Sequence, residues 1–471
     1  MRSRQFQHDL SRYAGIKGHG RLRIMGWLNH AVLVCLAISV SLCAYLAFAQ
    51  AAADRHSRQQ TPEGIRRAIW WEPWNPDHYA QLARALERPL KAGDLPEVVR
   101  LYEKAVQLSP HNAEYWDRLG QAYEWAGRVE AAQDAHERAA LLFPASPTMN
   151  WTIGNFYLRE GKTEPALHAF KRAILGDPEM RRPAFDLAWR ATGDGELIVH
   201  EMIPAQADIC FEYLNYLLDA ERLDEGTKVW DQIIDTGLHF EPRQAFPYLD
   251  ALILYRRIDQ LTAAWSALKE KNPSMFRDGT SHSNLITNGD FESEILNGGL
   301  DWRINQEPGA VISIDNLTFR DGIHSLQIRF EGNQNLSDAL IFQYVPVTPN
   351  TSYRFEGYLR AQGITTDSGP RFQIRDAGDP AELFLQTDDV VGNSSWVQRQ
   401  VDFKSGPSTR LLELRVARPP SAKFDNRIAG TVWVDQVVMT AIESAASTHL
   451  ARSMTHEAEA REIVGGSPSR K

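Results

Sequence analysis

The side chains that could do chemistry in this sequence are dispersed rather than grouped into a catalytic motif. The chain has no phosphate-binding glycine loop, no dinucleotide-binding glycine pattern, no nucleophile elbow and no H-E-x-x-H zinc motif. Two carboxylates, Glu356 and Glu413, fall on the same predicted strand face and have the chemistry of a glycosidase pair. Arginines surround them in the pattern, and nearby positive charge stabilises the ionised carboxylate, which does not suit a general acid. We therefore expect a protein that is not an enzyme.

A second set of side chains is suited to binding. Alternating runs at 352–360, 371–375 and 411–417 separate apolar from polar residues. The apolar side, expected in a core, holds Phe355, Leu359, Phe372, Ile374, Leu412, Leu414 and Val416. The polar side holds seven candidate glycan-binding residues: Arg354, Tyr358, Arg360, Arg371, Gln373, Arg375 and Arg415. An aromatic platform beside planar hydrogen-bonding groups suits a sugar, and the arginine excess favours an anionic one. The alternative is a solvated sheet face with cross-strand ion pairs.

The strongest regularity in the chain is a spacing of 34 residues. Four sets of residues follow it: Gly93, Gly127 and Gly161; Ala105, Ala139 and Ala173; Pro110, Pro144 and Pro178; Tyr102, His136 and Phe170. Small residues let two helices approach closely, glycine suits a tight turn, and proline ends a helix. The period therefore predicts paired antiparallel helices stacked into an array, because a single pair cannot bury its apolar face alone.

One unit carries a family signature. Trp116-x-x-Leu119-Gly120-x-x-Tyr123, followed by Ala132, Ala139 and Pro144, resembles the tetratricopeptide repeat. We expect an array over 62–275, regular at about 79–180, weaker at 205–238 and 247–273, and out of phase at 181–204. The resemblance implies a protein-binding groove on the concave face, with these candidate residues: Glu114, Asp117, Gln121, Glu124, Trp125, Trp151, Asn155 and Arg159.

After Pro273 the pattern changes to short alternating strands bounded by turn residues, which predicts an antiparallel β-sandwich. The opening LITNGDFES at 285–293, together with Trp302 and the closing Trp433-Val434-Asp435, resembles the jelly-roll carbohydrate-binding modules. That resemblance implies sugar binding and a possible structural Ca²⁺ held by Asp290, Glu292 and Asp435. No other cofactor is expected.

The N-terminal segment has the pattern of a membrane anchor. Residues 1–24 are basic, and Ala31–Ala49 carries no charge, so a spanning helix at about 25–49 is long enough to cross a bilayer. The basic flank predicts a cytoplasmic N-terminus with the bulk of the chain outside a single-pass inner membrane. The alternative is a cleaved signal peptide, since Ala47-Phe48-Ala49 fits the small-x-small rule.

Composition sets the remaining limits. A chain of 471 residues is expected to form two or three domains. Its net charge of −9 gives no indication of nucleic-acid binding. The three cysteines lack metal-ligand spacing. The expected organisation is α-helical and β-stranded in separate domains: a basic tail at 1–24, an anchor at 25–49, the tetratricopeptide array at 62–275, a carbohydrate-binding-like sandwich at 283–442 and a flexible tail at 443–471.

Together these features predict a membrane-anchored scaffold of the bacterial cell envelope. The array would bind a protein partner and the sandwich a polysaccharide, in exopolysaccharide assembly or export. Two alternatives stay open. One is a carbohydrate-binding module on a helical spacer, and the other is a glycan-active enzyme.

Overall fold

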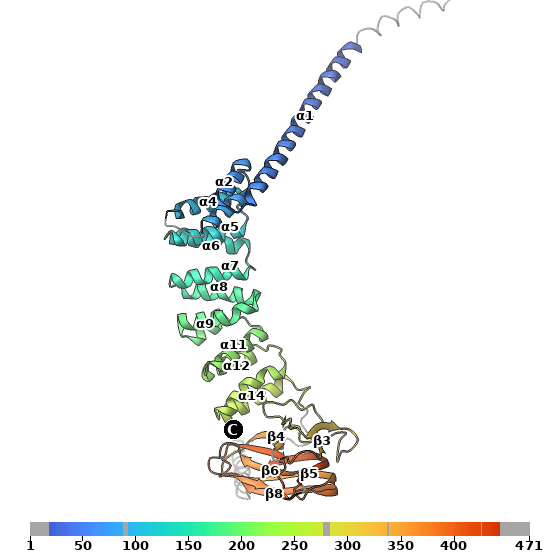
Figure 1. Cartoon of the computed structure of the whole chain (residues 1–471). Helices are drawn as coiled ribbons and strands as arrows, with labels where there is room; N and C mark the ends of the chain where they lie inside the picture. The colour runs from blue at the N-terminus through green and yellow to red at the C-terminus, as the bar shows by residue number, and fades with distance from the viewer. Residues whose placement is uncertain (1–17, 88–92, 277–282, 337–338, 425, 443–471) are drawn as a thin grey trace, which may run out of the picture. The chain divides into compact units, whose positions relative to one another are not determined.

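The computed structural model describes residues 18–87, 93–276, 283–336, 339–424 and 426–442 (Figure 1). The basic residues at 1–17 and the expected tail at 443–471 therefore lie outside the described residues. The chain divides into two compact units, Met1–Ile203 and Pro204–Lys471, and each is described by itself. Helices fill the first unit, whereas the second contains helices followed by strands.

The first unit begins with the long helix α1 (Gly18–Ser57), of 40 residues. Its segment His30–Ser57 is long and apolar enough to cross a membrane. The helix does not end where the apolar run ends. It continues and packs against α2 (Pro62–Trp71), which buries Ala49 and Ala53 completely. Thr61 caps α2 by accepting the Gly64 N–H at 3.1 Å.

The regular part of the array is built of paired helices, which confirms the expected repeat. Its helices are α3 (Pro76–Leu86), α4 (Leu95–Leu108), α5 (Ala113–Trp125), α6 (Val129–Leu142), α7 (Pro147–Arg159) and α8 (Thr163–Gly176). Each odd-numbered helix packs against the helix that follows it. Asn112 begins α5 by accepting the Glu114 N–H at 3.0 Å, and Ser146 begins α7 by accepting the Met149 N–H at 3.3 Å.

Glycine is required at the recurring positions for two different reasons. Gly127 and Gly161 both have φ of +69°, the left-handed conformation that ends the first helix of a pair. Gly120 instead lies against the ring of His136, where a Cβ would come within 2.7 Å. Gly154 meets Phe170 in the same way, at 2.6 Å. The period of 34 is therefore the repeat of one helix–helix contact.

The phase break at 181–204 has a structural cause. After the short 3₁₀ helix η1 (Pro178–Met180), α9 (Arg181–Thr192) ends at Gly193, with φ of +63°. Its partner α10 (Gly195–Glu201) has only 7 residues, half the length of α8. The second helix of this repeat is thus cut short, and the aromatic and alanine positions that mark a full-length helix are missing.

The second unit opens with the last two helix pairs. They are α11 (Ala207–Asp219) with α12 (Leu223–Asp235), and, after the 3₁₀ helix η2 (Pro242–Ala245), α13 (Phe246–Leu254) with α14 (Ile258–Lys271). Trp230 fills the expected seam position, since it is 3% exposed and stacks on Tyr248 with ring centres 5.4 Å apart. Trp265 fills the equivalent seam of the last pair and is 6% exposed.

Strands occupy the rest of this unit and form a sandwich of two antiparallel sheets. One sheet has the order β1-β4-β9-β6-β7 and the other the order β2-β3-β10-β5-β8. Their bounds are β1 (Arg303–Ile304), β2 (Ala310–Asp315), β3 (Ser325–Glu331), β4 (Ala339–Pro346), β5 (Ser352–Ile364), β6 (Arg371–Asp376), β7 (Phe384–Gln386), β8 (Gly392–Lys404), β9 (Leu411–Ala417) and β10 (Ala429–Ala441). We call the first the β4 sheet and the second the β5 sheet.

The expected core of the sandwich is confirmed, but the expected single polar face is wrong. All seven predicted apolar residues are buried: Phe355, Leu359, Phe372, Ile374, Leu412, Leu414 and Val416. The candidate glycan residues of β5, however, lie on the β5 sheet, and those of β6 and β9 lie on the β4 sheet. Two sheets that share a core turn their polar faces in opposite directions, so the set is divided between two surfaces.

The last helix pair and the sandwich pack closely through the loop before β1. A Cβ at Gly298 would come within 2.2 Å of Phe246, and one at Gly299 within 2.4 Å of Trp265. Arg303 of β1 forms an ion pair with Asp250 of α13, and its side chain is 18% exposed. Only glycine allows the loop to lie directly on these two aromatic rings.

Candidate functional site

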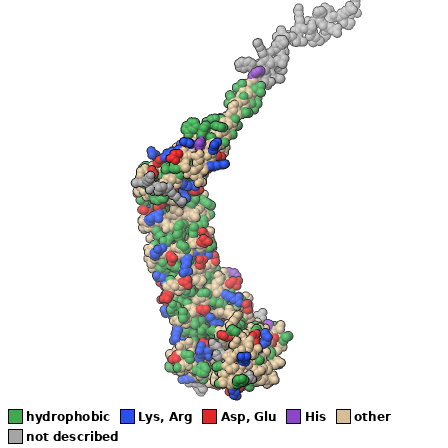
Figure 2. All heavy atoms as spheres, viewed as in Figure 1, with side chains coloured by type: hydrophobic (Ala, Val, Ile, Leu, Met, Phe, Trp, Pro, Cys, Tyr) green, Lys and Arg blue, Asp and Glu red, His purple; other side chains and the backbone are tan. Residues whose placement is uncertain are grey.

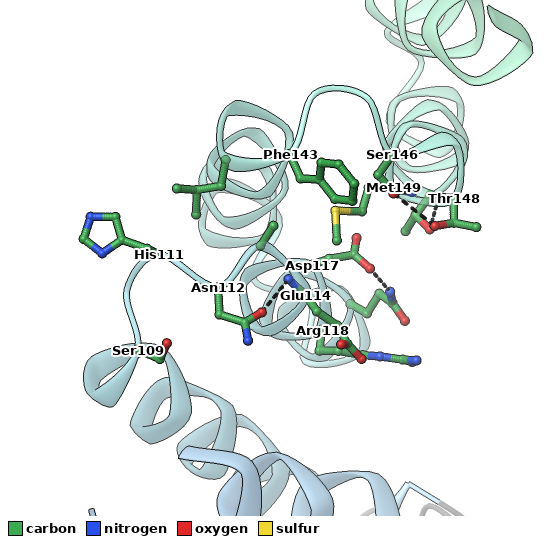
Figure 3. Close-up of a pocket in the computed structure, with 14 residues that line it drawn as sticks. Ser109, His111, Asn112, Glu114, Asp117, Arg118, Phe143, Ser146, Thr148 and Met149 are labelled. Atoms are coloured by element: carbon green, nitrogen blue, oxygen red, sulfur yellow. Dashed lines mark hydrogen bonds between the residues drawn. The ribbon is translucent and has the colours of Figure 1, made fainter. Parts of the chain in front are cut away.

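The candidate site is a polar groove across the first helices of two neighbouring repeats (Figure 3). It has a volume of about 1080 Å³. Helix α5 supplies Glu114, Asp117, Arg118 and Gln121, and the start of α7 supplies Thr148, Met149 and Thr152. Ala113 at the start of α5 and Leu142 at the end of α6 also line it. The loops before α5 and α7 complete it with Ser109, His111, Asn112, Phe143 and Ser146.

The groove lies at the amino-terminal halves of α5 and α7. Of the eight predicted groove residues, Glu114, Asp117 and Gln121 line it. Glu124, Trp125, Trp151, Asn155 and Arg159 do not. Trp151 packs on Phe170 with ring centres 5.3 Å apart. It therefore fills the seam between helices.

Sequence reasoning missed several lining residues. Arg118 and Met149 were absent from the predicted groove residues, and Phe143 belongs to the loop between repeats. Arg118 lies four residues after Glu114 and three before Gln121, so it shares their helix face and could have been found from the repeat phase. Phe143 and His111 carried no periodic signal, because the repeat pattern in the connections is restricted to the glycines and prolines that end the helices.

A chain of charged groups centred on the buried His136 lies beneath the groove. His136 of α6 is 1% exposed and hydrogen-bonds Glu124 through Nε2 at 2.8 Å. Its Nδ1 lies 3.4 Å from a carboxylate oxygen of Asp117, whose other oxygen accepts from Gln121 at 2.8 Å. Glu124 also forms an ion pair with Arg159 of the next repeat. One histidine therefore joins the groove floor to the contact between two repeats.

The surroundings of His136 decide its charge. Burial disfavours the protonated ring, but the hydrogen bonds and charges of Asp117 and Glu124 outweigh burial and raise the pKa of His136. Burial likewise acts to raise the pKa of Glu124, but its bonds to His136 and Arg159 prevail and lower it. The groove floor is thus an ionic network, which holds Gln121 and Asp117 in place.

The polar residues of the β4 sheet are largely satisfied by one another. Arg375 donates to Glu413 at 2.7 Å, and Arg371 donates to Asp389 at 2.9 Å. Arg415 donates to Gln373 at 2.5 Å. The arginine excess read from the sequence is therefore offset by Asp389, which lies outside the alternating runs. This pattern is the cross-strand pairing that was the alternative to sugar binding.

The candidate residues of the β5 sheet are also partnered. Arg354 donates two hydrogen bonds of 2.8 Å to Asp402. The guanidinium of Arg320 lies 3.7 Å from the centre of the Tyr358 ring, so an arginine covers the expected aromatic platform. Arg360 lies 5.5 Å from the ring of Trp433.

The two carboxylates considered as a glycosidase pair are not brought together. Glu356 lies on β5 and Glu413 on β9, in different sheets of the sandwich. Glu413 is buried and engaged by Arg375. No sugar bond can be flanked by these two carboxylates, since the core of the sandwich separates the two faces.

The calcium candidates lie where the first loop of the sandwich meets β10. Asp435 is fully buried and accepts the Arg320 N–H at 2.8 Å and the Gln436 N–H at 2.7 Å. Burial and the nearby Glu292 raise the pKa of Asp435 to about 6. Glu292 accepts the Ile323 and His324 N–H groups at 2.7 and 2.9 Å.

The contacts of Asp435 and Glu292 include one feature that favours calcium binding and one that opposes it. Two neighbouring carboxylates suit a divalent cation, but backbone N–H groups already use several of their oxygens. One carboxylate oxygen of Asp290 accepts a hydrogen bond from the Glu292 N–H at 3.4 Å. Within the described residues, no three His, Cys, Asp or Glu side chains are grouped to hold a metal. Calcium stays a prediction.

The N-terminal part of the chain is similar to one described protein family. Residues 12–152 match the family described as virulence factor membrane-bound polymerase, C-terminal. A comparison with curated proteins gives no match. The matched segment contains α1 and the helices through the first turns of α7, so it includes the membrane helix and the candidate groove.

Several solved structures resemble parts of the chain. MamA has a TM-score of 0.28 and 22% identity, over 32% of this chain and 89% of MamA. PilF of Pseudomonas aeruginosa has a TM-score of 0.23 and 17% identity, over 49% of this chain and 91% of PilF. The CBM22-1 xylan-binding domain of Xyn10C from Paenibacillus barcinonensis has a TM-score of 0.23 and 17% identity, over 33% of this chain and 94% of that domain. Each likeness covers less than half of this chain and concerns the fold alone.

Proposed function

We propose that this chain is a non-enzymatic, membrane-anchored scaffold that binds an extended polar segment of a protein partner in the α5–α7 groove. The groove carries the proposal. It offers an arginine, a glutamine amide, threonine hydroxyls and two carboxylates within one concave surface. An extended peptide presents N–H and C=O groups and side chains that such a mixed surface can pair. The ionic network beneath reduces the cost of ordering the groove on binding.

The setting that we propose is the polymerisation or export of an envelope polysaccharide. The match of residues 12–152 to a membrane-bound polymerase family supports this setting, because the matched segment includes the groove. The partner would then be another protein of the same membrane assembly. The basic residues that precede α1 favour a cytoplasmic N-terminus and an array outside the inner membrane.

We further propose that α1 is an uncleaved anchor. Cleavage after Ala49 would divide a continuous helix and remove Phe48, whose ring packs against Trp71 at 5.5 Å. Ala49 and Ala53 are both buried by α2, so the carboxyl end of α1 and helix α2 form a packed helix pair, which we call the first repeat. The size of the protein in isolated membranes tests this point. Loss of the first 49 residues would overturn it.

The groove is tested by a variant that fills it and reverses its charge. Arg118→Glu combined with Thr148→Trp should reduce both co-purification with the polysaccharide assembly and the amount of exported polymer, by about tenfold or more. The matched control is Arg138→Glu on α6, an exposed residue that does not line the groove. Equal co-purification and export by the two variants would exclude the groove as the binding site.

A second candidate function is sugar binding by the polar face of the β4 sheet, with the helices as a spacer. Tyr344 and Phe342 on β4 pack edge to face at 5.5 Å, and the guanidinium of Arg303 lies 5.5 Å from the Tyr344 ring. These two aromatic rings have the chemistry of a sugar platform, and Phe342 lies opposite Arg415 of β9. Gln373 is buried and accepts from Arg415, so it takes no part in this candidate site.

A glycan array with the full chain tests this candidate through Tyr344→Ala, with Tyr358→Ala on the opposite sheet as control. Sugar binding that is lost only in the first variant would support the β4 face. An absence of binding by the parent chain would exclude a sugar ligand. Unchanged oligosaccharides after prolonged incubation are expected as well, since we propose no enzymatic activity.

A further inference from the structure

Helix α2 runs back along α1 toward the membrane. The backbone turns at Gln60, with φ of +51°, so the two helices are antiparallel. Gly64 near the start of α2 is level with His56, whose carbonyl would lie 2.7 Å from a Cβ at Gly64. At the other end, Trp71 packs on Phe48 with ring centres 5.5 Å apart. The end of α2 therefore lies beside the apolar part of α1.

The helix geometry gives the depth of this end. Ala31–Ala49 has no charge and spans about 28 Å at 1.5 Å per residue, close to the hydrocarbon thickness of about 30 Å. Phe48 is then at the outer boundary of the hydrocarbon layer. Asp54, the first charged residue after the run, lies about 9 Å further out. Trp71, at the level of Phe48, falls within the headgroup region.

The side chains at this end of α2 are those that a membrane boundary favours. Trp70 is 73% exposed and Trp74 is 47% exposed. Trp70 also packs edge to face on Trp71, with ring centres 4.7 Å apart. Tryptophan concentrates at membrane boundaries because its ring is apolar while its N–H still reaches water or headgroups. We call Trp70, Trp71 and Trp74 the tryptophan tip.

Basic side chains lie on the water side of the tip. Arg67 is exposed one turn before Trp71 on α2, and Arg55 and Arg58 are exposed beyond Asp54. Arg66 is half exposed and forms an ion pair with Glu97 at 2.5 Å. Figure 2 shows the hydrophobic surface of α1 continuing down to the helices that follow it. Apolar rings toward the membrane and arginines behind them match the order of hydrocarbon, phosphate and water.

We propose that the tryptophan tip inserts into the outer boundary of the bilayer and that the exposed arginines contact lipid phosphates. The partner of this surface is a phospholipid membrane. The first repeat is therefore held at two points, the spanning helix and the tip, and this fixes its orientation to the membrane. The inference depends on the anchoring of α1 and is independent of what the groove binds.

Spin labels on the full chain in phosphatidylethanolamine–phosphatidylglycerol vesicles test the proposal. Single cysteines would replace Trp70, Arg67, Trp125 and Val40 in a chain with Cys35→Ser, Cys43→Ser and Cys210→Ala. Each nitroxide would be relaxed by oxygen, which enters lipid, and by a nickel chelate, which stays in water. Trp125→Cys is the matched control, because Trp125 is 46% exposed and belongs to a later repeat. Val40→Cys reports on α1 alone.

The oxygen-to-nickel ratio should be highest at Val40, about fivefold above Trp125 at Trp70, and intermediate at Arg67. Equal ratios at Trp70 and Trp125, with Val40 in lipid, would overturn the tip while leaving the anchor intact. A water-exposed label at Val40 would overturn both the anchor and the tip. Circular dichroism of each variant confirms that the helices are retained.

Discussion

The two ends of the helical array cover their apolar surfaces in different ways. A repeat array cannot end on an open helix pair, because the outer face of the last repeat would expose the residues that neighbouring repeats bury. At the carboxyl end, Trp265 and Phe246 are covered by the loop of the sandwich and are 6% and 8% exposed. At the amino end, Trp70 remains 73% exposed.

The two ends are stabilised by different contacts. The carboxyl end is completed within the chain by glycine contacts and the ion pair of Arg303 with Asp250. The amino end is completed only in part, by α1, and Trp70 and Trp74 remain 73% and 47% exposed. An apolar surface that the chain leaves open beside a spanning helix is what a membrane can cover. Substitutions at the two ends should therefore respond differently to the protein and to the lipid.

The largest effect is expected at the carboxyl end. Trp265→Ala should lower the free energy of unfolding of the second unit by about 3–5 kcal/mol, because a large buried ring is removed and a cavity is left. Urea unfolding of the full chain in detergent, followed by the near-ultraviolet signal of the sandwich, measures this loss. A change below about 1 kcal/mol would show that the sandwich does not depend on the last helix pair. Gly93→Ala, where no atom lies within 4 Å of the added Cβ, is the neutral control.

A pH-dependent effect is expected in the middle of the array, far from either end. His136→Phe places at this position the residue type that Phe170 has one repeat later. The folded-state pKa of His136 is raised, so its stabilisation is complete below about pH 6.5 and is lost as the pH rises through the folded-state value. The pKa of Glu124 is lowered, so its contribution is present above about pH 4.3 and is lost as the pH falls further.

The parent chain should therefore exceed His136→Phe in stability by about 2 kcal/mol between those limits, the usual size of a hydrogen bond to a charged group, and by less in alkaline solution. Thermal unfolding of both proteins over a pH series provides the measurement. A difference that grows with rising pH would contradict the ionic network. His111→Phe, at an exposed residue of the groove, serves as the control for loss of a histidine as such.

A smaller effect is expected from the ion pairs at the carboxyl end. A double-mutant cycle with Arg303→Ala and Asp250→Ala should give a coupling of about 1 kcal/mol, since Arg303 is mostly shielded from solvent. Arg410 and Asp259 join the same helix pair to the sandwich but are 47% and 84% exposed, so their coupling should be near zero. Equal couplings would mean that burial of Arg303 adds nothing to the contact.

Sequence reasoning was most successful where short-range sterics repeat. The spacing of Gly120 from Gly154 and of His136 from Phe170 records one close helix contact, so the array could be predicted from residue types alone. Alternation likewise identified the buried residues of β5 and β6. It could not assign these strands to different sheets, because alternation distinguishes the two sides of a strand and carries no information on strand order.

The candidate site was predicted less completely for a related reason. Asp117, Gln121 and the neighbouring Arg118 follow from the repeat phase, whereas Phe143 depends on where the loops between repeats leave space. The partners Asp389 and Arg320, which neutralise or cover predicted glycan residues, come from loops outside the alternating strands. Contacts between residues distant in sequence have no periodic signature, and these contacts decide which polar groups remain available to a ligand.

The smallest change in stability is expected at the tryptophan tip, and it distinguishes the open amino end of the array from the covered carboxyl end. Trp70→Ala removes a ring that is already exposed, so the free energy of unfolding in detergent should change by less than about 0.5 kcal/mol. The same indole in Trp265→Ala should cost several times more, because there the chain itself forms the surrounding apolar contacts. Thermal unfolding of the first unit, followed by circular dichroism, measures the Trp70 effect. In vesicles the variant should lose protection of Arg66 and Arg67 from trypsin, since the tip no longer holds α2 against the lipid. A large loss of stability in detergent would mean that Trp70 has a protein partner, and the amino end would then be completed within the chain, as the carboxyl end is.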